Sequence, residues 1–142
     1  MNTSFKSLFG QALLVTLASA FCYGAVTQAA DPCDRSAKTI KLKIKEKNNI
    51  PIKVTKGLFG TNADTINACR GDTIEWKLSG KKFFVEFPAE SPIDKKRENS
   101  NDGKLGITIG AEAKAGARYK YDVGIDGGGI LDPIIIIDNQ RN

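Results

Sequence analysis

Residues 71–87 read GDTIEWKLSGKKFFVEF, and this stretch carries two alternating segments with a turn between them. Apolar side chains occupy every second position on both sides of SGKK: Ile74, Trp76, Leu78, Phe83, Val85 and Phe87. A period of two places those side chains on one face of an extended chain, so each segment is predicted to be a half-buried β-strand. Glycine and lysine between them favour a tight connection, and Pro88 ends the second strand.

The same alternation extends outward in both directions. KTIKLKIKEK (38–47), LGITIG (105–110) and RYKYDVGI (118–125) each place apolar residues at alternate positions. In IPIKVTK (50–56) we expect Ile50, Ile52 and Val54 to share one face, and in IIIID (134–138) we expect burial on both sides. No helical periodicity is sustained after residue 30, and about eight short strands with turn signals between them predict an all-β, Greek-key β-sandwich.

One long segment departs from this pattern. Residues 88–104, PAESPIDKKRENSNDGK, are polar and contain two prolines and a cluster of charges. This composition is typical of a surface loop, and it leaves room for a short helical turn.

The first thirty residues have the features of a secretory signal peptide. Lys6 supplies the positive region, residues 8–21 supply the apolar region, and TQAA offers small residues for cleavage near Ala29 or Ala30. A transmembrane anchor is the alternative, but its apolar run would be shorter than the ~20 residues that a span requires. Cys22 follows Phe21 rather than a small residue, which disfavours lipidation. We expect residues 1–30 to be removed and residues 31–142 to form one periplasmic or secreted domain.

Two cysteines remain after that cleavage, Cys33 and Cys69. An even pair in an exported chain favours a disulfide, which would close a loop of roughly 35 residues. The alternative is a two-thiolate metal site. Thiolates that bind a metal usually lie two to four residues apart or act with histidine, and neither condition is met here.

The residue types that are missing from the chain exclude several classes of enzyme and metal site. The chain has no histidine, and its single methionine is Met1. Ser–His, Cys–His and His–carboxylate catalysis are therefore excluded, as are ordinary zinc and blue-copper sites. An enzyme that uses carboxylates alone stays open as a minor alternative, although no pair can be singled out. The net charge of +5, or +4 without Lys6, accompanies no nucleic-acid-binding motif.

Three motifs, taken in order, resemble the cupredoxin family. GDTIEW (71–76) resembles the cupredoxin strand with Gly-Asp and Trp at the same spacing. KKFFVEF (81–87) follows it as the hairpin where that family places its first copper histidine. YKYDV (119–123) resembles the Tyr-x-Tyr-x-Cys strand that leads into the copper-ligand loop. The resemblance covers roughly residues 38–138 and implies a cupredoxin-like sandwich of two facing sheets.

The copper ligands of that family do not carry over. The family's slots for histidine, cysteine, histidine and methionine fall at Phe83 or Phe84, at Val123, near Asp126 or Gly127, and near Leu131 or Asp132. None of these side chains can bind copper as the family does. The resemblance therefore implies a copper-free member that keeps only a vestigial ligand loop, and we expect no cofactor.

Two further motifs have both a functional and a structural interpretation. In DGGGILD (126–132), Asp126 and Asp132 could hold a hard cation such as calcium, which takes six to eight oxygen ligands. The favoured interpretation is a turn in which glycines permit positive φ. RGD at 70–72 matches an adhesion tripeptide, but Gly71 is better explained by the turn before the Trp76 strand.

A basic stripe runs along the first strand. Lys41, Lys43, Lys45 and Lys47 share one face, and they could contact an anionic surface such as lipid headgroups or an acidic protein. The favoured alternative is an edge strand whose lysines block pairing with another sheet.

The sequence thus favours an exported, non-catalytic cupredoxin-like module that acts on an unknown protein partner through an edge strand or the 89–104 loop. The alternative is a copper- or redox-related periplasmic protein. Trp76, Phe83, Phe87, Tyr119 and Tyr121 are expected in the core, with one tyrosine hydroxyl bonded to a loop backbone.

Overall fold

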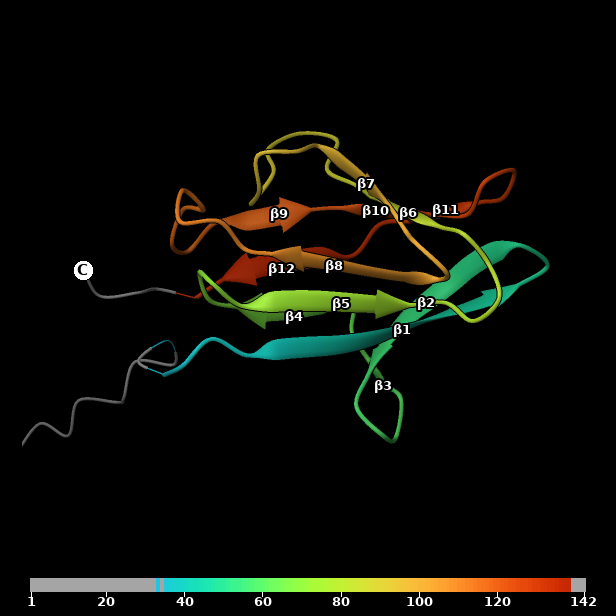
Figure 1. Ribbon diagram of the computed structural model, residues 1–142, viewed down its shortest axis with the longest axis horizontal. Coiled ribbons are helices and arrows are strands. Elements are labelled where there is room, and N and C mark those ends of the chain that lie inside the picture. Colours follow the sequence, from blue (N-terminus) through green and yellow to red (C-terminus); the bar gives the residue numbers. More distant parts are fainter. Residues whose placement is uncertain (1–32, 34, 139–142) are drawn as a thin grey trace, which may run out of the picture.

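The computed structural model describes residue 33 and residues 35–138, and this part of the chain is all β. Twelve strands follow one another along it, and no helix occurs among the described residues (Figure 1). Consequently no described segment forms a helix long and apolar enough to cross a membrane. The predicted signal peptide, with its cleavage point near Ala29 or Ala30, lies outside the described residues.

The largest sheet has five strands in the order β3-β2-β1-β5-β8. Their bounds are β1 (Thr39–Lys47), β2 (Ile50–Lys56), β3 (Thr61–Asn62), β5 (Thr73–Lys77) and β8 (Lys104–Thr108). Strand β1 runs parallel to β5 and antiparallel to β2, so the sheet is mixed. The lysine-bearing strand β1 is therefore an interior strand, and the expectation that it lies at an edge was wrong.

Two smaller sheets complete the fold. One has the order β11-β10-β6-β7 and the other has the order β4-β12-β9. Their bounds are β4 (Thr65–Ala68), β6 (Phe84–Glu86), β7 (Arg97–Asn99), β9 (Arg118–Lys120), β10 (Asp122–Gly124), β11 (Ile130–Leu131) and β12 (Ile134–Ile137). Only Tyr121 separates β9 from β10, so one extended segment links the two sheets. This arrangement is consistent with a β-sandwich.

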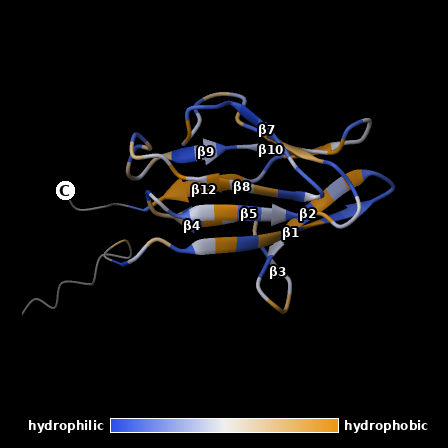
Figure 2. Ribbon diagram, in the orientation of Figure 1, coloured by the Kyte–Doolittle hydropathy of each residue, from blue (hydrophilic) through white to orange (hydrophobic). Residues whose placement is uncertain are grey.

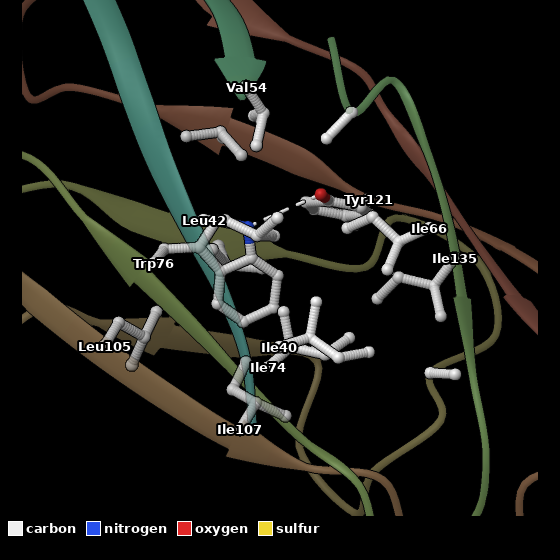
Figure 3. Close-up of a cluster of buried hydrophobic side chains, with 14 of the residues drawn as sticks. Ile40, Leu42, Val54, Ile66, Ile74, Trp76, Leu105, Ile107, Tyr121 and Ile135 are labelled. Carbon is white, nitrogen blue, oxygen red and sulfur yellow. Dashed lines mark hydrogen bonds between the residues drawn. The ribbon is translucent and has the colours of Figure 1, made fainter. Parts of the chain in front are cut away.

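The core lies between the large sheet and the two smaller ones. Figure 3 shows Leu42, Trp76 and Leu105 of the large sheet together with Ile66 and Ile135 of the three-stranded sheet β4-β12-β9. The Trp76 side chain is fully buried, and its Nε1–H donates a 3.4 Å hydrogen bond to Tyr121 Oη. The alternating apolar positions of residues 74–87, 105–109 and 119–125 all point inward, as the sequence predicts.

Tyr119 ties a loop to this core. Its hydroxyl oxygen accepts a 2.9 Å hydrogen bond from the backbone N–H of Lys114, five residues earlier in the chain. The predicted bond between a tyrosine hydroxyl and a loop backbone is thus confirmed. The aromatic ring is buried while the hydroxyl satisfies a backbone donor that would otherwise lose its water partner.

The expected burial of strand β2 was only partly right. Val54 is buried, but Ile50 and Ile52 are 49% and 53% exposed, and Pro51 is buried in their place. The pairing of β1 with β2 shifts register between Lys45 and Glu46. A shift of one residue changes which side chains face the core, so the alternation of β2 breaks in its middle.

Two other expectations need correction. The polar segment 88–104 contains strand β7, which pairs with β6, and no helical turn. In β12, Ile135 and Ile137 are fully buried, whereas Ile134 and Ile136 are half-buried, so only one face is closed off from solvent. The strand count exceeds about eight because several of the twelve strands are only two to four residues long.

Candidate functional site

The glycine-rich turn 126–129 packs against the turn between β1 and β2. A Cβ on Gly128 would lie 1.9 Å from the backbone oxygen of Asn49, and a Cβ on Gly129 would lie 2.8 Å from Ile50 Cγ2. Gly127 has a positive φ of 74°, with open space around it. The glycines therefore serve two purposes: Gly127 permits the turn, and Gly128 and Gly129 permit the close approach of the Asn49 backbone and the Ile50 side chain.

The four positions of the vestigial ligand loop lie in two different environments. Phe83 and Val123 are buried in the core, and Val123 pairs with Val85 across β10 and β6. Asp126 and Asp132 are exposed to solvent. The buried slots hold only hydrocarbon and the exposed slots only carboxylates, so these four side chains offer no imidazole, thiolate or thioether to a soft metal ion.

A stacked cluster fills the space beside Val123. The Phe84 ring lies over Gly124, where a Cβ would come within 2.1 Å of it. The guanidinium of Arg97 lies 3.8 Å from the centre of the same ring. Arg97 also donates a hydrogen bond to Glu86. A cation–π contact and a glycine thus hold an aromatic ring where the resemblance would place a copper histidine.

Asp132 forms an ion pair with Lys120 at 2.5 Å. The hydrogen bond lowers the pKa of the Asp132 carboxyl and raises the pKa of the Lys120 ammonium. Partial burial, with the nearby carboxylates of Asp132 and Glu86, raises the pKa of Asp122. The carboxylate of Asp132 already has a cation partner within the chain.

The predicted disulfide between Cys33 and Cys69 is confirmed, with its Cα atoms 5.6 Å apart. Within the described residues, one group of three metal-ligating side chains comes together, Cys33, Cys69 and Asp138. Because the two sulfur atoms are bonded to each other, this group offers no thiolate pair. Asp126 and Asp132 belong to no such group among the described residues.

Sequence reasoning missed the cluster around Asp72. This side chain is fully buried, and the Arg35 guanidinium donates to both of its oxygens at 3.0 and 2.7 Å. The backbone N–H groups of Lys38 and Cys69 donate to them as well. Burial alone would raise the pKa of Asp72, but these four hydrogen bonds outweigh it and lower the pKa to about 2.

The same cluster decides between the two interpretations of the RGD motif at residues 70–72. Asp72 is buried and turned toward Arg35, and Arg70 Nε donates a 2.7 Å hydrogen bond to the carbonyl of Ala113. Adhesion through this tripeptide would need both side chains on an exposed loop. The structure therefore contradicts that interpretation and supports the structural one, a turn at Gly71.

At the turn end of the fold, three isoleucines are exposed. Ile50, Ile52 and Ile130 have 49%, 53% and 62% of their surface exposed, and we call them the isoleucine patch. Ile50 lies against Gly129, and Ile52 lines one cavity with Leu131 and Pro133. The fold thereby gathers residues from β2 and β11, which are far apart in the sequence.

Paired charges surround this patch. The Lys81 ammonium lies 3.0 Å from Glu46 and 2.6 Å from Asn49 Oδ1, and Lys120 pairs with Asp132. The backbone N–H of Asn49 also donates to Glu46 at 2.9 Å. Each of these charges is neutralised by a neighbour. Lys47, which lies opposite Ile50, and Lys53, which lines the cavity with Ile52, form no ion pair with another described residue.

The predicted lysine stripe runs along β1. Lys41, Lys43, Lys45 and Lys47 are all exposed and alternate with buried or half-buried residues. None of the four forms an ion pair with another described residue.

No protein-family model matches the chain, and the search of curated proteins found no significant match. The fold and the site together define an all-β protein of sandwich-like architecture with a disulfide at one end and an isoleucine patch at the other.

Proposed function

We propose that the chain is an exported, non-catalytic binding module, a copper-free relative of the cupredoxins, that contacts a protein partner through the isoleucine patch. The observation that carries this proposal is the exposure of three branched apolar side chains next to the glycine turn. The patch includes Ile130 of β11, which is an edge strand of its sheet, and so keeps the expected edge-strand contact in preference to the 89–104 loop.

The surroundings of the patch support a protein partner. Protein interfaces combine an apolar centre with a polar rim, and charged groups are depleted at the centre. The isoleucines provide such a centre, and the Glu46–Lys81 and Lys120–Asp132 pairs provide such a rim. Branched apolar side chains held on a rigid backbone also lose little entropy when they are covered.

The residues at the ligand slots support a role without copper. Val123 and Phe83 occupy the core with no polar atom in the side chain, and Asp132 is paired with Lys120. The disulfide fits an oxidising compartment and so supports export to the periplasm or the medium. The absence of histidine from the whole chain supports a non-catalytic role.

Site-specific photo-crosslinking in the native host tests the patch. A photoreactive residue replaces Ile52 or Ile130 in separate variants, and an exposed residue of β8, Thr108, serves as the control position. We expect one discrete crosslinked protein at both patch positions and none at Thr108. The double variant I50S/I52S with the probe at Ile130 should lose that product while it retains the far-UV circular dichroism spectrum of the parent. An identical product at Thr108, or an unchanged product in the double variant, would contradict the proposal.

Copper loading separates this proposal from the alternative of a copper- or redox-related protein. The purified exported protein is incubated with Cu(II), passed over a desalting column and analysed for metal. We expect less than stoichiometric copper and no intense thiolate-to-copper absorption, because no thiolate, imidazole or thioether is available. One copper per chain with such an absorption band would overturn the copper-free assignment.

A further inference from the structure

The outer face of the large sheet carries lysines in adjacent register. Lys43 of β1 lies opposite Lys77 of β5, and Lys77 lies opposite Lys104 of β8. On the other side, Lys45 of β1 lies opposite Lys53 of β2. Residues paired across strands point to the same face, so these side chains form one surface. We call this surface the lysine face: Lys41, Lys43, Lys45, Lys53, Lys77 and Lys104.

The positive charge of this face is largely uncompensated. Its members are all exposed, and none forms an ion pair with another described residue. Glu75 lies opposite Lys41, and Glu46, which shares a cavity with Lys43 and Lys45, is already paired with Lys81. Like charges directly opposite each other destabilise a sheet. An arrangement that lowers stability in this way is expected where an anionic ligand supplies the missing countercharge.

A second feature adjoins the lysine face, at the connection from β2 to β3. Leu58 and Phe59 are 91% and 96% exposed, and we call them the apolar tip. Gly57 and Gly60 flank them with positive φ angles of 73° and 66°, and Gly60 N–H donates to Gly57 O. The loop projects away from the sheets in Figure 1, and Figure 2 colours its tip as hydrophobic. A backbone hydrogen bond closes the turn. Because the Leu58 and Phe59 side chains are almost fully exposed, they contribute nothing to the core.

The apolar tip and the lysine face meet at one cavity. Its volume is about 460 Å³, and Leu58 lines it together with four lysines and one carboxylate: Lys41, Lys43, Lys77, Lys104 and Glu75. A ligand at this place would contact ammonium groups and exposed hydrocarbon at the same time. Inorganic anions and acidic polysaccharides match only the first of these, because they bring no apolar group for Leu58 and Phe59.

We propose that the lysine face and the apolar tip together dock the protein onto the surface of an anionic phospholipid bilayer. The ammonium groups contact the phosphate headgroups, and the Leu58 and Phe59 side chains enter the boundary with the acyl chains. The long lysine stems allow their charges to reach the headgroup level from a twisted sheet. This proposal uses other residues than the isoleucine patch and does not depend on the protein-binding proposal.

Vesicle sedimentation tests the electrostatic part. The protein is purified as the cell exports it and is mixed with vesicles of phosphatidylcholine alone or with added phosphatidylglycerol. We expect binding to the anionic vesicles at low salt, weaker binding at high salt, and none to phosphatidylcholine alone. The triple variant K43Q/K77Q/K104Q should bind about a hundredfold more weakly. The control K95Q/K96Q/K114Q removes the same charge from other exposed positions and should bind like the parent.

Insertion of the tip needs its own readout. In F59W the new indole joins Trp76, which is fully buried and so provides a constant background. We expect its emission to shift to shorter wavelength on anionic vesicles and to be quenched by lipids brominated in the acyl chain. The variant L58S/F59S should bind at least about tenfold more weakly, since burial of apolar surface is lost.

The outcomes separate the proposal from its rivals. Loss of vesicle binding in both the lysine and the tip variants, with a blue shift in F59W, supports it. Failure to sediment with anionic vesicles overturns it. Binding that polyglutamate abolishes, with no change in F59W emission, also overturns it and indicates an acidic protein as the partner. Equal weakening by K95Q/K96Q/K114Q would show that only net charge matters and would overturn the assigned face.

Discussion

The Arg35 guanidinium holds the buried carboxylate of Asp72 in a two-pronged ion pair, with N–O distances of 2.7 and 3.0 Å. Arg35 lies in the segment before β1, and Asp72 lies in the turn before β5. The pair therefore fastens the beginning of the fold to its centre. The Cys33–Cys69 disulfide joins the same two segments covalently.

This ion pair predicts a specific acid sensitivity. The pKa of Asp72 is lowered from 3.8 to about 2 in the folded protein, so its stabilising effect is complete above pH 4 and is lost as pH falls toward 2. The effect amounts to about 2 kcal/mol of unfolding free energy. Urea unfolding at neutral pH and at pH 3 should show a decrease that is smaller in D72N. The exposed D94N should keep the full decrease, and an unchanged decrease in D72N would contradict the assignment.

Removal of the disulfide should destabilise the fold without changing its architecture. Cys33 and Cys69 are 36 residues apart, and a loop of that size corresponds to about 3–4 kcal/mol on the chain-entropy model. The double variant C33S/C69S should therefore melt about 10–20 °C below the parent. Addition of a reductant should lower the melting temperature of the parent and leave that of the variant unchanged. A variant that melts like the oxidised parent would show that the disulfide adds nothing.

Gly128→Ala should loosen the turn end of the molecule. The added methyl would meet the backbone oxygen of Asn49 at 1.9 Å, which backbone movement alone can relieve. We expect a loss of about 1–3 kcal/mol in unfolding free energy. Gly106→Ala is the matched control, because a methyl there would lie 3.9 Å from Thr73 Cγ2. Similar stabilities for the two variants would contradict the close approach.

The hydroxyl groups of Tyr121 and Tyr119 should contribute different amounts to the free energy of unfolding. Y121F leaves the Trp76 Nε1–H without its acceptor in a fully buried place, so we expect a loss of about 1–3 kcal/mol. Y119F frees the partly buried N–H of Lys114 and should cost about 1 kcal/mol. Trp76 is the single tryptophan, so its fluorescence during urea unfolding reports both losses. A neutral Y121F would show that the 3.4 Å bond does not contribute.

Periodicity predicted most of the strands because it reports directly on burial. Ile74, Trp76 and Leu78 could be assigned to the core from their spacing alone. The prediction failed at Ile50 and Ile52, because the pairing with β1 skips Ile52 of β2 and so changes which side chains of β2 face the core. A register shift depends on how two strands pair, and one strand's own pattern contains no information about its partner.

The order of the strands within each sheet likewise could not be predicted from the sequence. The lysines of β1 resemble those of an edge strand, but β1 lies between β2 and β5. The row of Lys43, Lys77 and Lys104 exists only because β1 pairs with β5 in parallel and β5 pairs with β8. Arg35 and Asp72 meet for the same reason, over a separation that no local motif records.

The site was partly predictable. Its glycine turn was expected from DGGG, and the absence of copper ligands followed from composition. That Asn49 approaches Gly128, and that Ile50 and Ile130 are exposed at the same end, depends on the packing of two distant turns. Leu58 and Phe59 were overlooked because two apolar residues between glycines give no periodic signal.

Strand β12 lies between β4 and β9 and pairs with both of them. Strands β4 and β9 do not pair with each other, so neither has a partner in this sheet until β12 is in place. Its parallel partner, β4, is made about seventy residues earlier in the chain. Because the chain is synthesised from its N-terminus, the backbone groups of β4 stay unpaired in this sheet until residues 134–137 have been made. We expect the three-stranded sheet to form in a late, all-or-none step, because both of its outer strands pair only with β12.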